Sequence, residues 1–224
     1  APGIKVLHKA LAEIGDTFVV APHVERSAAS HAISIHNPLR VVQLEENVFA
    51  VEGSPADSVM LGLRCLVPRK PDFVVSGINR GANLGLDTLY SGTVAAAMEG
   101  ALHGIPGIAF SLHGYGEYRF ETAAKISQKL FDYPDWLAMG REGVLNVNIP
   151  NVDTKDIAGF QVAGLGRRRY EEEMIHRTDP RGREYYWIGA GGQEYFPIPG
   201  SDCEKIEENY LTITALQPEL TDRK

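Results

Sequence analysis

The sequence predicts a doubly wound α/β protein with a mostly parallel sheet, followed by a carboxyl-terminal antiparallel β-hairpin arm. Two observations lead to this prediction. Short apolar segments of strand character alternate with segments of helical periodicity as far as about Asn151. Beyond that point, short β-branched or aromatic runs lie between charged and glycine-rich loops. At 224 residues the chain suits one unit with an appendage, which we divide into an α/β domain, 1–155, and a β-rich arm and oligomerisation region, 156–224.

The first part of the chain has the pattern of a helix, a strand, a hairpin and a second helix. Pro2 suits the first turn of a helix, and Leu7 and Leu11 recur at helical spacing. An apolar strand follows, so the chain begins with the second half of a βα unit and we expect a further strand ahead of Ala1. Ser54 is a natural N-cap for the second helix. The elements expected here are a helix at Pro2–Ile14, a strand at Thr17–Ala21, a hairpin or meander within Ser27–Gly53, and a helix at Pro55–Leu66.

Strands and helices then alternate up to Ile149, and the appendage follows. The alanine-rich helix after Ser91 has small side chains, which let a helix lie close to a sheet. In the appendage, arginines 167–169 precede glutamates 171–173. This charge-dense arm either reaches a neighbouring subunit or stays a solvated hairpin. The elements expected are strands at Phe73–Ser76, Ile108–Ser111 and Val144–Ile149, helices at Gly92–Leu102 and Phe120–Phe131, and appendage strands at Phe160–Val162, Tyr185–Ile188 and Leu211–Thr214.

Composition and charge exclude several classes of function. The net charge of −7 repels polyanions, so we expect no duplex nucleic acid partner, although a local site can still bind a small phosphorylated ligand. No apolar run approaches the ~18 residues that a membrane span needs, and we find no signal peptide and no zinc-ligand spacing. Cys65 and Cys203 lie outside any CxxC spacing, which indicates reduced thiols. We therefore expect a cytoplasmic protein without a membrane partner.

The segment that follows the Phe73–Ser76 strand alternates glycine and asparagine, with the sequence SGINRGANLG from Ser76 to Gly85. In open α/β sheets, ligands bind beyond the carboxyl ends of the strands. Glycine lets main-chain amides approach a ligand closely, and asparagine offers both an acceptor and a donor. This loop therefore predicts a ligand-binding edge.

The helix that begins after this loop predicts a phosphate cradle. Ser91 is its natural N-cap, and the free amides of Gly92 and Thr93, the two hydroxyls and the helix dipole together make an anion site. The sequence has neither GxxxxGKS/T nor GxGxxG after a strand, so a P-loop and a dinucleotide fold are disfavoured. A capped helix start that binds no ligand is the alternative.

Two neutral oxygen donors at the same edge are candidate ligands of a hard cation. Ser27 follows the first apolar strand, and Asn79 follows the next one. Sites for Mg²⁺ or Mn²⁺ also require carboxylates. We expect Asp87 to act in an Asx turn and Glu99 to lie out of reach. The carboxylates would then come from the end of the strand expected ahead of Ala1.

The run VVSGINRGANLGLDTLYSGTVAAAMEG closely resembles the SurE family, the survival-protein nucleotidases. The resemblance extends over nearly the whole chain and includes the runs APGIKVLHKAL, ERSAAS, GSPADSV, GIPGIAFSL, LNVNIP, TDPRGREYYWIG and YLTITAL. The chain departs from the family pattern at Ala28, where glycine is common.

The resemblance implies a Rossmann-like three-layer fold and a metal-dependent phosphatase, a 5′-nucleotidase acting on nucleoside monophosphates or other small phosphate monoesters with Mn²⁺ or Mg²⁺. It implies a homodimer or homotetramer that exchanges the carboxyl-terminal arm. The family's metal is held by two adjacent aspartates at the end of the first strand, which would precede Ala1, and by a serine and an asparagine that match Ser27 and Asn79. The family's phosphate contacts match Asn83, Ser91, Gly92 and Thr93.

Three functions remain open at this point. With an aspartate pair ahead of Ala1 the protein is a nucleotidase, and without it the protein is a non-catalytic phosphate- or nucleotide-binding protein. An oligomeric scaffold is the third, and it would show no thermal shift with nucleotide and Mn²⁺. The sequence leaves open the base preference, for which Tyr115, Tyr118 and Arg80 are candidate contacts, and the choices between Mg²⁺ and Mn²⁺ and between dimer and tetramer.

Overall fold

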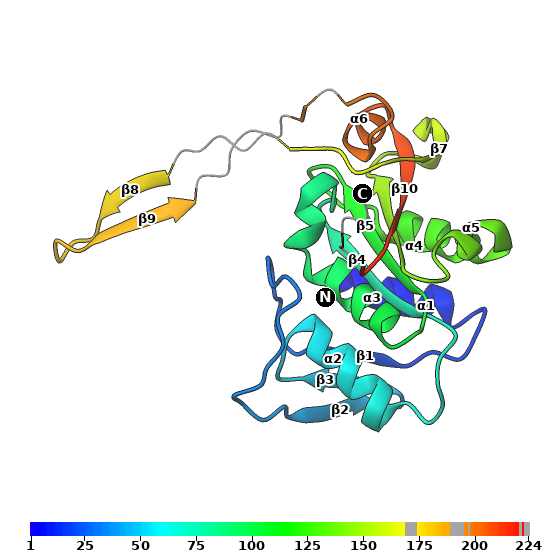
Figure 1. Cartoon of the computed structure of the whole chain (residues 1–224), viewed down its shortest axis with the longest axis horizontal. Coiled ribbons are helices and arrows are strands. Elements are labelled where there is room, and N and C mark those ends of the chain that lie inside the picture. Colours follow the sequence, from blue (N-terminus) through cyan, green and yellow to red (C-terminus); the bar gives the residue numbers. More distant parts are fainter. Residues whose placement is uncertain (169–173, 189–194, 197, 220, 222–224) are drawn as a thin grey trace.

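The strands of the computed structural model form two sheets and a separate hairpin (Figure 1). The structure describes residues 1–168, 174–188, 195–196, 198–219 and 221. In these residues the strands are β1 (Val19–Pro22), β2 (Val41–Glu45), β3 (Val48–Val51), β4 (Val74–Arg80), β5 (Gly107–His113), β6 (Val144–Pro150), β7 (Gly159–Val162), β8 (Met174–Thr178), β9 (Glu184–Ile188) and β10 (Tyr210–Leu216). The α-helices are α1 (Pro2–Leu11), α2 (Pro55–Leu61), α3 (Gly92–Leu102), α4 (Phe120–Lys129), α5 (Pro134–Met139) and α6 (Asp202–Glu207).

Both sheets are mixed, and parallel pairs predominate. The larger sheet has the order β4-β5-β6-β10-β7, in which only the β6–β10 pair is antiparallel. The smaller sheet has the order β1-β3-β2, with β1 parallel and β2 antiparallel to β3. The predicted α/β class with a carboxyl-terminal antiparallel hairpin is therefore confirmed.

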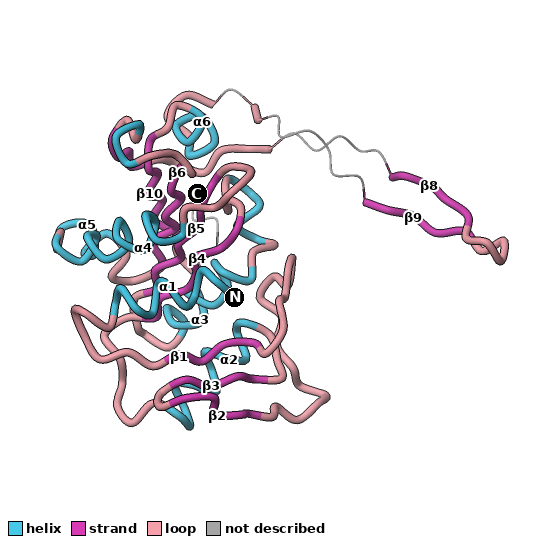
Figure 2. The backbone as a smooth tube through the Cα atoms, turned by 180° about the vertical axis from the view of Figure 1, so that it is seen from behind, coloured by secondary structure: helices cyan, strands magenta, loops and turns pink. Residues whose placement is uncertain are grey.

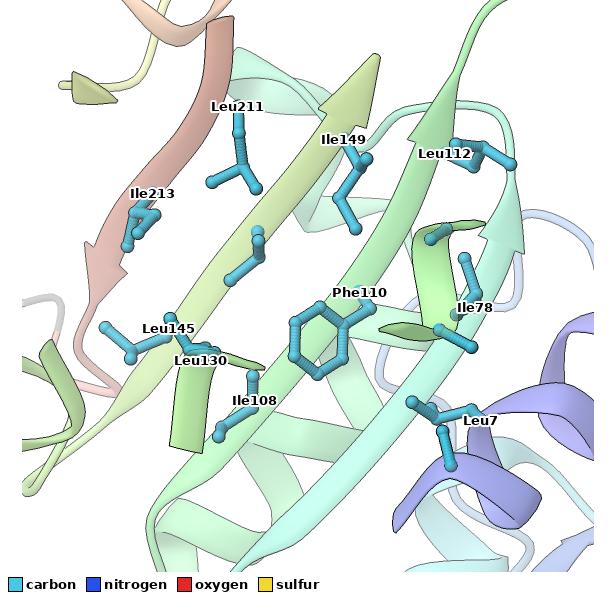
Figure 3. Close-up of a cluster of buried hydrophobic side chains, with 14 residues drawn as sticks. Leu7, Ile78, Ile108, Phe110, Leu112, Leu130, Leu145, Ile149, Leu211 and Ile213 are labelled. Carbon is cyan, nitrogen blue, oxygen red and sulfur yellow. The ribbon is translucent and has the colours of Figure 1, made fainter. Parts of the chain in front are cut away.

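Helices cover both faces of the larger sheet, which gives the predicted three layers. On one face, α1 and α4 pack on the alternate apolar side chains of β5 and β6. Figure 3 shows this core, in which Phe110 lies between Ile108 and Ile78 and is fully buried. On the other face, α3 lies so close to the sheet that a side chain at Gly107 would collide with the carbonyl of Ala97. The alanines of α3 therefore permit the close approach that the sequence predicted.

The structure corrects several predicted boundaries. The first helix ends at Leu11 rather than Ile14, because residues 12–14 form a turn. The β-branched run Ile33–Ile35 forms no strand, and the hairpin consists of β2 and β3 alone. The strand expected at Phe73–Ser76 continues through the glycine–asparagine segment to Arg80, since the end of β4 pairs with β5. The sequence analysis did not anticipate α5 and α6.

Two strands that the sequence analysis assigned to the appendage belong to the larger sheet. Phe160–Val162 lies in β7 and Leu211–Thr214 in β10. These two strands pair with each other, and β10 also pairs with β6, so both belong to the larger sheet and not to the arm. The remaining appendage strand, Tyr185–Ile188, lies in β9 and pairs with β8. The hairpin β8–β9 stands apart from both sheets when seen from either side (Figures 1 and 2). Arg169 and the glutamates 171–173 lie outside the described residues.

No helix in the described part of the chain combines the length and the apolar character that crossing a membrane requires.

The carboxylate of Asp57 holds the long loop between β1 and β2 on helix α2. Asp57 forms a capping box with Ser54 at the start of α2, which confirms Ser54 as the N-cap. Its two oxygens also accept hydrogen bonds from the main-chain nitrogen and hydroxyl of Ser34, at 2.8 and 2.7 Å. Burial alone would raise the pKa of the Asp57 carboxyl, but the hydrogen bonds from Ser54 and Ser34 bring it below its ordinary value.

We expect Asp57→Ala to lower the free energy of unfolding by about 3 kcal/mol at pH 7, because it removes a buried carboxylate that accepts three hydrogen bonds. Since the folded state depresses this pKa, the contribution is present above the unfolded value of about 3.9 and is lost as the pH falls through the folded value. Urea unfolding at pH 7 and at about pH 3 measures both effects. The control Asp16→Ala removes an exposed pair with Arg69, and an equal loss in the two variants would contradict the role of Asp57.

Candidate active site

The start of α3 has the geometry of an anion-binding helix terminus. The Ser91 hydroxyl accepts a hydrogen bond from the Val94 nitrogen at 3.1 Å, so the predicted N-cap is confirmed. Ser91 and Gly92 are buried and Thr93 is half-buried. The first turn contains no acidic residue, so the positive end of the helix dipole is not compensated there.

The turn that carries Ser27 lies against this helix start. A side chain at Gly92 would come within 3.4 Å of the Ala29 side chain. One residue farther along the turn, the Ser30 nitrogen donates to the Tyr90 carbonyl at 3.0 Å. The structure therefore brings the predicted metal ligand Ser27, which is exposed, together with the predicted phosphate contacts at the start of α3.

Ala28 in this turn has a φ of 51°, in the left-handed region that glycine adopts most easily. The departure from the family pattern noted in the sequence therefore falls where a glycine would relieve local backbone strain.

Asn79 lies at the carboxyl end of β4, beside Ser111 of β5. Its side-chain nitrogen donates to the Gly81 carbonyl at 2.9 Å, which leaves the side-chain oxygen as the acceptor end. The start of α1 packs on the same strand, where a side chain at Gly3 would collide with the Ile78 carbonyl. The first residues of the chain thus lie next to the second predicted metal ligand.

Asn83 is an anchor beneath the loop. Its side-chain nitrogen donates to the Ser111 hydroxyl at 2.5 Å. Its main-chain nitrogen donates to Asn148 Oδ1 at 2.8 Å, and its carbonyl accepts from Asn146 Nδ2 at 2.7 Å and Asn148 Nδ2 at 3.2 Å. All four residues are buried. The predicted phosphate contact of Asn83 stays a prediction, and the structure adds a role in fixing the loop.

Sequence reasoning missed Asn146 and Asn148 as supports of the site. The signal was present in the run LNVNIP, where two asparagines alternate with apolar residues in a strand that is buried throughout. Both asparagines therefore lie on one face of β6. Polar side chains at such positions need partners, and Asn83 in the loop supplies them for both amide nitrogens and for the side-chain oxygen of Asn148.

Asp202, at the start of α6, links the same loop to the segment around Gly166. This fully buried carboxylate accepts hydrogen bonds from the main-chain nitrogens of Gly85 at 2.9 Å, Gly166 at 2.6 Å and Cys203 at 2.8 Å. Gly85 has a φ of 51°, and a side chain there would collide with the Gly166 carbonyl. Burial and the Asp202 charge both raise the pKa of the Cys203 thiol.

Two other acidic residues near the loop are engaged in ion pairs. The Asp87 carboxylate pairs with Arg168 Nη1 at 3.1 Å, a partner that the predicted Asx turn did not include. Glu99 is buried within α3, where its two oxygens lie 2.7 Å from His31 Nε2 and 3.1 Å from His103 Nε2. His31 belongs to the β1–β2 loop, so Glu99 helps to hold that loop on α3.

A groove separates the two sheets on their facing edges. Its volume is about 460 Å³, and it is lined by apolar side chains of α1, β1 and β4 that include Leu7, Val20 and Val75. Among the described strands, β1 and β4 are end strands of their sheets. Each therefore offers main-chain groups to a further strand on the side that faces the groove.

The donors present suit part of the coordination shell of a hard cation. Ser27 and Asn79 carry side-chain oxygens, the ligand atom that Mg²⁺ and Mn²⁺ prefer, but both oxygens are neutral. Within the described ranges, no group of three or more histidine, cysteine, aspartate or glutamate side chains is placed to hold a metal ion. Carboxylates from another segment are therefore needed to complete such a site.

Comparison with known proteins places the chain in a family. The family described as "Survival protein SurE" matches residues 1–172. The chain belongs to the SurE family. Among curated SurE relatives, the 5′-nucleotidase SurE of Geotalea daltonii is 44% identical over 223 residues, covering 99% of this chain and 90% of the relative. That of Nitrosococcus oceani is 44% identical over 221 residues, covering 99% and 88%.

The fold matches a SurE protein of known structure. The crystal structure of the SurE protein from Aquifex aeolicus aligns with a TM-score of 0.87 and 39% sequence identity, covering 99% of this chain and 90% of that chain. The predicted SurE resemblance is confirmed for the family and the fold. The individual roles given to Ser27, Asn79, Asn83, Ser91, Gly92 and Thr93 stay predictions.

We expect Asp202→Asn to weaken the binding of inorganic phosphate about tenfold, because an amide nitrogen would oppose one of the main-chain donors that now hold the loop. We also expect a loss of about 2 kcal/mol in the free energy of unfolding. Isothermal titration with phosphate and urea unfolding measure the two effects. The control is Asp153→Asn, which alters an exposed ion pair with Arg119. Unchanged phosphate affinity in a folded Asp202→Asn protein would refute the role of Asp202 in holding the loop for phosphate binding.

Proposed function

We propose that this SurE protein is a metal-dependent 5′-nucleotidase that hydrolyses nucleoside monophosphates. The observation that carries the proposal is the contact of the Ser27 turn with the capped start of α3. Asn79 lies at the carboxyl end of β4, the strand that leads into the loop before this helix. Full-length similarity to proteins named 5′-nucleotidase SurE supports it.

A strand ahead of Ala1 would complete the site in this proposal. The groove between β1 and β4 has the apolar lining and the two strand edges that a central parallel strand requires. Because α1 begins against the end of β4, such a strand would end beside Asn79. Two adjacent aspartates there would supply the carboxylates for Mn²⁺ or Mg²⁺, together with Ser27 and Asn79.

In this proposal, one set of residues would hold the ion and another would bind the phosphoryl group. When bound, the ion would polarise a phosphoryl oxygen and lower the pKa of a bound water. Ser27 and Asn79 would hold the ion through neutral oxygens. The hydroxyls of Ser91 and Thr93 and the free amides of the first turn of α3 would bind the phosphoryl oxygens. Donors fixed before the reaction stabilise charge that develops in the transition state.

The hairpin β8–β9 is the proposed oligomerisation element. It is the part of the region 156–224 that stands apart from the larger sheet, to which β7 and β10 belong. Its large side chains are exposed, with Tyr186 at 61%, Trp187 at 63% and Ile188 at 84%. An isolated two-stranded hairpin is marginally stable in water. Packing on a second copy of the chain would bury these side chains, and we propose a homodimer or homotetramer.

We place the protein in the cytoplasm. Cys65 and Cys203 are free thiols, as is usual in reducing compartments. The expected partners there are small phosphate monoesters.

We expect Asn79→Ala and Ser91→Ala to fail in different ways, in a chain that carries the proposed strand ahead of Ala1. Asn79→Ala should raise the Mn²⁺ concentration for half-maximal activity about tenfold, so that excess Mn²⁺ partly restores the rate. Ser91→Ala should instead raise KM for the nucleotide at saturating Mn²⁺, by about tenfold, because a charged hydrogen bond is lost. Steady-state kinetics over a Mn²⁺ series separates the two effects.

Asn47→Gly is the control for both variants, since Asn47 lies in the β2–β3 turn with a φ of 60° that glycine also adopts. A rate that no Mn²⁺ concentration restores in Asn79→Ala would count against its metal role. Nucleotide binding without turnover in the parent protein would favour the non-catalytic alternative.

We expect Trp187→Glu to shift the protein toward monomer, because burying a carboxylate in an apolar interface costs several kcal/mol. Light scattering over a concentration series measures the mass. Leu102→Glu alters an exposed apolar residue at the end of α3 and should leave the mass unchanged. A monomeric parent protein would refute the assignment of the arm.

A further inference from the structure

A second cavity lies at the carboxyl edge of the larger sheet, beside the loop that leads to the phosphate cradle. Its volume is about 200 Å³, and its lining includes Gly81, Asp87, His113, Tyr115, Tyr118 and Arg168. We propose that this cavity is the subsite for the base of the nucleoside monophosphate, with the ring of Tyr115 as its stacking surface. The inference rests on the proposed function, in which the phosphate group binds at the start of α3.

The loop that carries Tyr115 is held in one conformation. The side-chain nitrogen of Asn151 donates to the carbonyls of Tyr115 at 3.2 Å and Glu117 at 3.0 Å. The side-chain oxygen of Asn151 accepts from the Arg119 nitrogen at 2.9 Å. A loop fixed by three hydrogen bonds presents its side chains in a defined place, which reduces the entropy lost on binding.

Tyr118 closes one side of the cavity but has no free face. Its hydroxyl donates to the Gly114 carbonyl at 2.7 Å. The Arg80 guanidinium lies 5.4 Å from its ring centroid, and Phe120 stacks on it at 5.7 Å. Tyr118 is therefore committed to supporting the loop.

Tyr115 differs from Tyr118 because its side chain is 71% exposed. A large aromatic ring that stands exposed on a rigid loop beside a cavity provides a flat apolar surface at little entropic cost. Nucleobases stack on such surfaces whatever their hydrogen-bonding edge. This ring is accordingly the surface that we assign to the base.

The opposite walls provide polar groups for the edge of a base. His113 Nε2 lies 3.2 Å from Glu207 Oε1. Burial lowers the pKa of His113, and this outweighs the opposing effect of the Glu207 charge. A neutral His113 that donates to Glu207 keeps Nδ1 as an acceptor. The half-buried ion pair of Asp87 and Arg168 forms part of the same lining.

The size and place of the cavity fit one ring system attached to a phosphate bound at α3. Its volume lies below the roughly 300–1,000 Å³ of sites that enclose a whole ligand. Gly81 and Asp87 belong to the segment that continues through the 3₁₀ turn Gly85–Leu89 to Ser91. One continuous loop thus borders both the cavity and the phosphate cradle.

The experiment compares adenosine 5′-monophosphate with ribose 5-phosphate, which has the same phosphate and sugar but no base. Isothermal titration in EDTA measures both affinities without turnover. We expect the parent protein to bind the nucleotide about tenfold more tightly, as stacking of one base on an aromatic ring provides. Tyr115→Ala should abolish this preference without changing the affinity for ribose 5-phosphate, and Tyr115→Phe should retain it.

Tyr133→Ala is the matched control, since Tyr133 is also an exposed tyrosine but follows the far end of α4. Equal affinity of the parent protein for the two ligands, or an equal loss of both in Tyr115→Ala, would overturn the subsite. If the nucleotide binds selectively but Mn²⁺ produces no hydrolysis in the chain with the proposed strand, the subsite stands and the nucleotidase proposal fails. If both phosphates are hydrolysed without preference, the nucleotidase proposal stands and the subsite fails.

Discussion

The candidate site depends on one constraint: residues Asn83–Gly85 of the loop between β4 and α3 are buried, so their main-chain groups need hydrogen-bond partners inside the protein. The side-chain nitrogens of Asn146 and Asn148 donate to the carbonyl of Asn83, and the side-chain oxygen of Asn148 accepts from its main-chain nitrogen. The carboxylate of Asp202, at the start of α6, accepts a hydrogen bond from the main-chain nitrogen of Gly85. These bonds fix both ends of a short segment whose continuation is the N-cap of α3. The helix terminus is thereby presented at a set position before any ligand arrives, which is the condition for effective electrostatic stabilisation.

The second half of the site comes from the smaller sheet and is held by different carboxylates. Asp57 fixes the β1–β2 loop at Ser34, and Glu99 fixes it at His31. Ser27 lies in the same loop, a few residues earlier. The two sheets therefore contribute separate, independently anchored segments that meet at the start of α3. A change in either anchor would alter the distance between the Ser27 turn and the helix terminus without disturbing the core that Figure 3 shows.

Local sequence patterns predicted the parts of the site whose structure depends on neighbouring residues. They failed where the structure depends on strand pairing or hydrogen bonds between residues far apart in the sequence. Ser91 caps α3 because a serine before an alanine-rich run has that property in almost any context. Asn79 was expected in a loop, since glycine and asparagine disfavour strands, but pairing with β5 keeps it in β4. Ile33–Ile35 has strand propensity and finds no partner strand. The bond from Gly85 to Asp202 spans 117 residues, and no periodicity or motif carries that information.

The arrangement of charge explains how an acidic chain can offer a site to an anion. The net charge is −7, yet the carboxylates closest to the loop are each bound by donors: Asp202 by three amides, Asp87 by Arg168, and Glu99 by two histidines. A carboxylate that is paired with hydrogen-bond donors contributes less negative electrostatic potential at the site than an unpaired carboxylate does. The start of α3 offers hydroxyls, amides and the positive end of the helix dipole, and its first turn has no acidic residue. Pairing of the surrounding carboxylates with donors is the arrangement that the proposed phosphate site requires in a chain of net negative charge.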